Sequence, residues 1–96
     1  MRTLHVISNI LEENSTVLVT LFRDADENFG INVDGNVIDE LIPDSPADRS
    51  GKLDIGDEIL SVGSDSVSEI DDVTSFLEVA GQTSYSLVLK IMKGKK

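Results

Sequence analysis

A single glycine between two large apolar residues, in the stretch Asn28-Phe29-Gly30-Ile31, is the feature that most constrains how this 96-residue chain can fold. The stretch stands where a charged loop, residues 23–27, gives way to a segment of alternating apolar side chains. Because glycine has no Cβ, the backbone at Gly30 can turn so that successive N–H groups point outward together. Such a group of amides can bind the carboxylate at the end of an added peptide strand. The four residues therefore predict the start of a strand, with either an ordinary turn or a carboxylate-binding loop before it.

Alternating apolar residues recur along the chain and predict a series of strands, because successive side chains of a strand point to opposite faces. The turn signal Asp34-Gly35 separates two of these segments and predicts a tight hairpin. The predicted strands span residues 15–23, 29–33, 37–42, 58–62 and 84–92, with a very short one at residues 66–67.

Two segments carry helix signals. Residues 45–51 begin with a capping serine and a proline and end with a glycine, which predicts one helical turn over residues 46–50. Residues 68–71 have the S-x-x-D form of a capping box variant, and apolar residues with a helical period follow them. This predicts an amphipathic helix over residues 71–80, with Gly81 as its stop.

Strands outnumber helices and do not alternate with them regularly, so we expect a mainly β fold with two helices. The expected architecture is a small, partly open antiparallel β-barrel or sandwich of five to six strands, capped by one short and one long helix. We expect one domain over residues 15–93 and a basic tail over residues 94–96. Residues 1–14 form a predicted N-terminal extension, in which residues 4–14 suit a helix or a short strand and the spacing favours the helix.

The charge of the chain bears on its partners. The formal net charge is −10 at pH 7, and four of the eight basic residues lie in the last seven positions. The remaining, strongly acidic part of the chain repels phosphate backbones, so no nucleic-acid binding is expected. Its acidic residues either attract basic segments of a partner or only keep the domain solvated. No apolar run reaches the roughly 20 residues that span a bilayer, and there is no cysteine. We therefore expect no membrane insertion and an intracellular setting.

The sequence shows no arrangement of residues suited to catalysis or to binding a metal. Asp24-x-Asp26-x-Asn28 resembles the start of a calcium loop, but the required glycine and bidentate glutamate do not follow. His5 is the only histidine, and adjacent acids such as Asp71-Asp72 would not face each other on a helix. We therefore expect no enzymatic activity, no metal and no cofactor.

Residues 45–62 read S-P-A-D-R-S-G-K-L-D-I-G-D-E-I-L-S-V. They resemble the PDZ domain family, whose pattern in this region, S/G-P-A-x-x-x-G-x-L-x-x-G-D-x-I-L-x-V, is matched at every specified position. The resemblance covers roughly residues 16–93 and includes the x-Φ-G-Φ loop at residues 28–31. Gly63-Ser64 departs from the Asn-Gly usual in the family, and the link to the long helix is shorter than in many members. The resemblance implies a module that binds protein C-termini by strand addition, without catalysis.

The resemblance also implies a set of site residues. The terminal carboxylate would meet the N–H groups of Phe29, Gly30 and Ile31, and Asn32 would touch the next-to-last ligand residue. The implied loop is Asn28, Phe29, Gly30 and Ile31, and the implied strand and pocket residues are Asn32, Val33, Ile70, Thr74 and Leu77. Arg23 is expected either to be a solvated charge or to act through water near the carboxylate.

The side chains of this set predict the preferred ligand. Phe29, Ile31 and Val33 would line the pocket for an apolar last residue together with Leu77. Ile70, at the first groove-facing helix position and flanked by Thr74, would favour an apolar residue two before the end. Alternatively, Ile70 packs inward on the core.

The implied partner is the C-terminal tail of another protein, held with on the order of micromolar affinity because few ligand residues are contacted. The alternative is a scaffolding or regulatory domain that binds an internal segment, or that forms a weak homodimer through the same strand edge. The implied location is the cytoplasm, or the inner face of a membrane reached through the partner.

Overall fold

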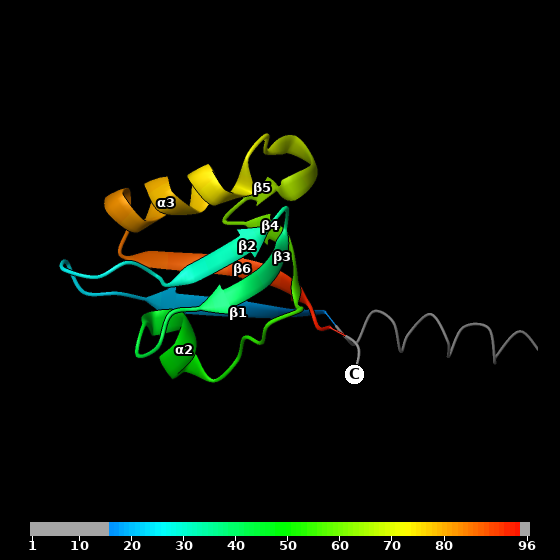
Figure 1. The fold of residues 1–96 in the computed structure, drawn as a ribbon. Helices are drawn as coiled ribbons and strands as arrows, with labels where there is room; N and C mark the ends of the chain where they lie inside the picture. Colours follow the sequence, from blue (N-terminus) through cyan, green and yellow to red (C-terminus); the bar gives the residue numbers. More distant parts are fainter. Residues whose placement is uncertain (1–15, 95–96) are drawn as a thin grey trace, which may run out of the picture.

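The computed structural model describes residues 16–94 and shows one curled antiparallel sheet with a helix at each opening (Figure 1). The strands are β1 (Thr16–Phe22), β2 (Ile31–Asp34), β3 (Val37–Leu41), β4 (Glu58–Val62), β5 (Asp65–Ser66) and β6 (Ser86–Met92). The helices are α2 (Pro46–Ser50), the 3₁₀ turn η1 (Val67–Glu69) and α3 (Val73–Thr83). The strand order is β1-β6-β4-β3-β2, with β5 paired to β4. The predicted mainly β class is confirmed, whereas the predictions for residues 1–14 and for the last two lysines lie outside the described residues.

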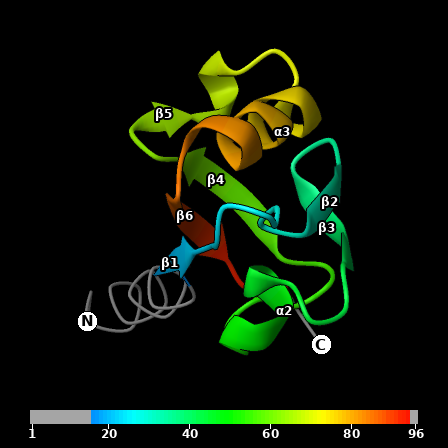
Figure 2. The same ribbon diagram turned by 90° about the vertical axis from the view of Figure 1, so that its left-hand side faces the viewer.

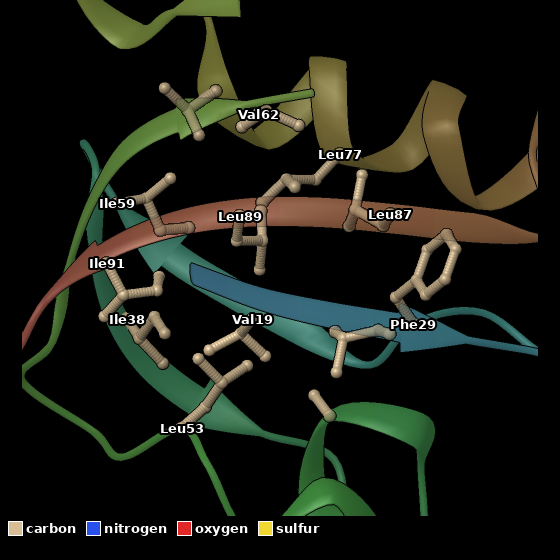
Figure 3. Close-up of a cluster of buried hydrophobic side chains, with 13 residues drawn as sticks. Val19, Phe29, Ile38, Leu53, Ile59, Val62, Leu77, Leu87, Leu89 and Ile91 are labelled. Carbon is tan, nitrogen blue, oxygen red and sulfur yellow. The ribbon is translucent and has the colours of Figure 1, made fainter. Parts of the chain in front are cut away.

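The inner face of the sheet forms the core (Figure 3). On β6, Leu87, Leu89 and Ile91 are buried and alternate with exposed residues, as a strand with one face on the core requires. Val73 and Leu77 bring α3 onto the same cluster. Figure 2 shows the result from one end, with α3 over one opening of the curled sheet and α2 over the other.

The short helix α2 forms as its local signals predict. The Ser45 side chain accepts a hydrogen bond from the Asp48 N–H at 3.3 Å, Pro46 occupies the first turn, and Gly51 ends the helix at φ +67°. Because Ser45, Pro46 and Ala47 are also buried, the capped end of α2 faces the core.

The predicted start of the long helix at Asp71 is wrong. Asp72 caps α3 instead, since its carboxylate accepts from the Ser75 N–H at 3.3 Å and from the Ser75 hydroxyl at 3.0 Å. The first two residues of the S-x-x-D segment at residues 68–71 lie in η1, which Ser66 caps. Two capping residues thus lie close together in the chain: Ser66 caps η1, and Asp72 caps α3.

Gly81 does not stop this helix, which continues to Thr83. Gly81 is buried inside α3, and a Cβ at this position would overlap the side chain of Asn28. The glycine therefore serves close packing of α3 on the loop before β2, and the prediction of a helix stop is wrong.

Most of the predicted strands differ from the observed ones by one or two residues at a boundary. β2 begins at Ile31 rather than Phe29, because Gly30 has φ +86° and breaks the extended backbone. The hairpin turn consists of Gly35-Asn36, with Asp34 still in the strand, and the short strand β5 covers Asp65–Ser66. The predicted order of the elements is unaffected.

A buried carboxylate ties the end of β6 to the turn before β4. Asp57 is 1% exposed, and its side chain accepts hydrogen bonds from Lys93 Nζ at 2.6 Å and from the N–H groups of Gly94 and Asp54, each at 2.9 Å. Burial alone would raise the pKa of Asp57, but the ammonium and the two amides outweigh it and hold that pKa below its ordinary value of 3.8. The ionised carboxylate therefore stabilises the folded state.

We expect Asp57→Asn to lower the free energy of unfolding at pH 7 by about 1–3 kcal/mol, because a buried charge-assisted network loses its acceptor. The folded-state pKa is depressed, so the contribution of Asp57 is present above pH 3.8 and is lost as the pH falls below that value. Urea denaturation from pH 7 to pH 2 measures both effects.

The control is Asp54→Asn, since Asp54 contacts the same Lys93 Nζ at 3.1 Å but is 61% exposed. An exposed pair contributes little, so this variant should lose less than about 1 kcal/mol. Equal losses for the two variants would contradict the assigned role of Asp57.

Candidate functional site

β2 has one free edge. It pairs with β3 in the register Ile31↔Leu41, Asn32↔Glu40 and Val33↔Ile38, and among the described strands it has no partner on the other side. α3 lies beside this free edge, as both views of the ribbon show (Figures 1 and 2). Strand and helix thus form the two walls of a groove whose floor belongs to the core.

The turn before β2 points its carbonyl groups inward. The Phe29 carbonyl accepts from the Ala47 N–H at 3.0 Å, and the Gly30 carbonyl accepts from the Ile42 N–H at 2.9 Å. Within residues 16–94, no hydrogen bond satisfies the N–H group of Phe29 or that of Gly30. These two amides at the end of the groove are therefore available as donors for a ligand.

Gly30 is required here for two separate reasons. Its φ of +86° lies in a region that side-chain-bearing residues rarely adopt. In addition, a Cβ would overlap the side chain of Ser45, the buried cap of α2. The shape of the turn and its contact with α2 thus both depend on the missing side chain.

A depression of about 170 Å³ lies at this end of the groove. Phe29 and Leu77 are buried and form its apolar floor, and half-buried Ile31 also lines it. Its lining residues are Asn28, Phe29, Gly30, Ile31, Asn32, Ile42, Leu77 and Glu78. The structure thus brings six of the sequence-predicted site residues together around one opening.

Ile42 and Glu78 were missed by the sequence analysis. Glu78 lies four residues after Thr74, so the helical period alone could have placed it on the groove side of α3. No sequence signal marked Ile42, which reaches the site because β3 ends beside Gly30. Val33, which was predicted to line the pocket, does not border this depression and packs half-buried against the core.

A second depression of about 380 Å³ lies between the β2–β3 turn and the start of α3. Its lining residues are Gly35, Asn36, Val67, Ile70, Asp71, Asp72, Val73 and Thr74. Ile70 and exposed Thr74 therefore border the same opening, at the far end of the groove from Gly30.

Ile70 is not at the first groove-facing position of the helix, and that prediction is wrong. It ends η1 in an extended conformation, donates its N–H to the Val67 carbonyl at 3.1 Å, and precedes the first residue of α3 by three positions. It also packs against the core, which was the alternative expectation. The first exposed residue of α3 on the groove side is Thr74.

Arg23 is not a solvated charge, and that expectation is also wrong. Its side chain donates to the carbonyls of Ser84 at 2.7 Å, Asp24 at 3.0 Å and Glu27 at 3.0 Å. The guanidinium lies 4.8 Å from the ring centre of Tyr85, which adds a cation–π contact. Arg23 thus holds the loop before the site in place, and its accessory role near a carboxylate stays a prediction.

A second arginine holds the same loop from outside. Arg49 of α2 contacts both carboxylate oxygens of Glu27, at 3.1 and 3.3 Å. The hydrogen bond from Arg49, together with the Asp24 N–H, lowers the pKa of Glu27. The loop over residues 23–28 is thereby tied to α2 as well as to the start of β6.

The groove offers amide donors and apolar side chains. Within the part of the chain that the structure describes, no group of His, Cys, Asp and Glu side chains could hold a metal ion. None of the helices in residues 16–94 is long and apolar enough to cross a bilayer. The donors and the apolar floor suit a ligand that ends in an acceptor and carries an apolar side chain beside it.

The sequence and the fold were compared with those of known proteins, and the family match is to the PDZ domain. The family model described as the PDZ domain matches residues 37–91. The chain is 37% identical over 62 residues to serine protease HTRA1 of Xenopus tropicalis, a match that covers 65% of this chain and 13% of the protease. The fold is similar to that of the Dlg1 PDZ2 domain of the choanoflagellate Monosiga brevicollis, at a TM-score of 0.70 and 24% identity over 82% of this chain and 99% of that one.

A second solved structure shows a related domain with a ligand. The N-terminal PDZ domain of InaD, in complex with a NorpA C-terminal peptide, is 26% identical to this chain with a TM-score of 0.64. The match covers 79% of this chain and 94% of the InaD domain. It is a protein–peptide complex on a fold like the one described above.

We expect Gly30→Ala to lower the free energy of unfolding by roughly 2–5 kcal/mol, because left-handed backbone strain and the overlap with Ser45 add together. Urea denaturation followed by circular dichroism measures the loss.

The control is Gly35→Ala, where φ is +66° but nothing lies within 4 Å of the added Cβ. This variant should lose only the backbone strain, about 1–2 kcal/mol. If both variants lose the same amount, the contact with Ser45 does not constrain the turn.

Proposed function

The chain belongs to the PDZ domain family of protein-interaction modules, and on that premise we propose that it binds the C-terminal ends of partner proteins by adding them as a strand to β2. The observation that carries the proposal is the pair of amide donors, Phe29 and Gly30, at the end of the free β2 edge. A chain end supplies both a carboxylate for these donors and an extended backbone for the edge.

The geometry of the groove supports one direction for the ligand. A carboxylate at Gly30 sits beside the first residue of β2, so the rest of the ligand runs toward Asp34, antiparallel to β2. Hydrogen bonds to a charged acceptor contribute about 1.5–3 kcal/mol each. The carboxylate is therefore the strongest anchor of the proposed complex, with the Ile31 amide as the expected third donor.

The last ligand side chain enters the depression of about 170 Å³ beside Gly30. Phe29, Ile31 and Leu77 supply an apolar surface there, so a final Val, Leu or Ile is expected. Burying such a side chain contributes roughly 1.5–3 kcal/mol.

The residue two before the end lies opposite Val33 in this register. Since half-buried Val33 faces the core side of β2, this ligand side chain points toward the second depression, where Ile70 and Thr74 meet. We therefore propose an apolar ligand residue two before the end because Ile70 lines this depression, although Ile70 does not belong to α3.

A second mode of binding uses the same edge. The free β2 edge can also pair with an internal segment or with a second copy of the chain, because backbone groups are the same at every position. The amide donors at Gly30 favour a chain end over these partners. No catalytic step is part of the proposal.

We expect hexapeptides that end in Val with a free carboxylate to bind at least about tenfold more tightly than the same peptides with an amidated end. Fluorescence anisotropy of labelled peptides measures both dissociation constants. Equal affinity of the two forms would refute capture of the chain end and would favour an internal segment.

We further expect peptides with Val two before the end to bind about three- to tenfold more tightly than peptides with Ser there. Ile70→Ser should remove most of this preference. The control is Val79→Ser, since Val79 is 56% exposed on α3 and borders neither groove depression. A preference that survives Ile70→Ser unchanged would refute the role of Ile70.

A further inference from the structure

The rim of the groove carries charge of one sign. Asp34 ends β2, Glu78 borders the depression beside Gly30, and Asp71 and Asp72 border the one beside Thr74. Within residues 16–94, no lysine or arginine borders either depression. A ligand in the groove therefore meets carboxylates along the rim, with no basic side chain among the residues that line the two depressions.

Three of the described basic residues are used elsewhere. Arg23 is buried against Tyr85, and Arg49 is paired with Glu27. Lys93 contacts the carboxylates of Asp54 and Asp57. These three cations are engaged in holding the fold, and none of them borders either depression of the groove.

Asp34 has a defined position relative to the ligand. Exposed Asn32 and Asp34 alternate with half-buried Ile31 and Val33, so both polar side chains lie on the outer face of β2. Among the described residues, the Asp34 carboxylate makes no hydrogen bond and no ion pair, whereas the Asn32 side chain donates to Glu40 at 2.7 Å. Asp34 is thus the carboxylate on this edge with no partner inside the described chain.

The proposed register identifies the ligand residue that meets Asp34. If the last residue lies beside Ile31, each step back along an antiparallel ligand moves one residue forward on β2, so the residue three before the end lies opposite Asp34. Side chains directly opposite each other on neighbouring strands share a face and lie about 4.5–5.5 Å apart at Cβ. A lysine or arginine three residues before the end of the ligand can therefore reach the Asp34 carboxylate and form an ion pair with it.

We propose that this groove selects C-terminal tails with a lysine or arginine three residues before the end, held by Asp34. The proposal rests on the proposed function, because it takes its register from capture of the terminal carboxylate at Gly30. Glu78 and Asp71 reinforce the choice, since an acidic tail would bring further negative charge to the same rim.

The test uses three hexapeptides that end in Val-Gly-Val and differ only three residues before the end, where they carry Lys, Gln or Glu. We expect the Lys peptide to bind the full chain about three- to fivefold more tightly than the Gln peptide and about tenfold more tightly than the Glu peptide at roughly 50 mM NaCl. The differences should shrink at about 500 mM NaCl, where exposed charges are screened over a few ångströms.

Two variants locate the effect. Asp34→Asn keeps the size of the side chain and should bring the Lys and Gln peptides within about twofold of each other. Asp65→Asn removes the same charge from β5, which lies on the other side of α3 from β2 (Figure 2), and should keep the preference. If Asp34→Asn leaves the preference for Lys intact, the assignment to Asp34 is wrong.

Amidated versions of the three peptides separate this proposal from the function on which it rests. If amidation weakens binding but the three free-acid peptides bind equally, chain-end capture stands and the selection of basic tails is refuted. If amidation has no effect, capture of the chain end fails, and the register that leads to Asp34 fails with it.

Discussion

The close approach of Ser45 to Gly30 is the contact on which the site depends. Ser45 caps α2 and is buried against the bare Cα of Gly30, so one side chain both starts a helix and supports the turn before β2. The next residues of α2 continue this support, because the Ala47 N–H binds the Phe29 carbonyl. With that carbonyl directed inward, the adjacent amides are left at the groove. A five-residue helix thereby determines where a ligand's acceptor can bind.

The loop before the turn is held from three sides. Arg23 binds its carbonyls from within, Arg49 binds Glu27 from α2, and Asn28 packs on Gly81 of α3. A loop that becomes ordered only on binding weakens affinity, because its loss of conformational entropy opposes the favourable interactions with the ligand. A loop that is already ordered carries less of this cost. Arg23, which the sequence analysis expected either in the solvent or near the carboxylate, thus contributes to preorganisation of the site.

The free edge of β2 is open to a ligand, but it is poorly suited to pairing with itself. β2 has only four residues, and short edge strands with charged side chains resist edge-to-edge association. Two copies paired through this edge would also bring two acidic rims together, since Asp34 and Glu78 border it on each copy. Like charges at close range oppose such a pair. The charges that would favour a basic tail therefore also disfavour the weak homodimer considered from the sequence.

Much of the fold could be predicted because its signals are local. Capping and proline chemistry defined α2 to the residue, and the apolar alternation placed each long strand to within about two residues. The turn at Gly30 was also recognisable, because a glycine between apolar residues at the start of a strand has few other uses. Six of the site residues that the family resemblance implied meet at one depression.

Only the tertiary structure decided the remaining features. The sequence determined where the chain forms strands, a capped short helix and a glycine turn, since those depend on neighbours in the chain. It could not decide whether Gly81 ends a helix or admits Asn28, whether Arg23 faces water or the loop carbonyls, or where Ile70 lies relative to α3. Each of these features depends on a residue or an element that is distant in the chain. The local sequence pattern is compatible with every way in which that distant part could pack, so it cannot select one of them.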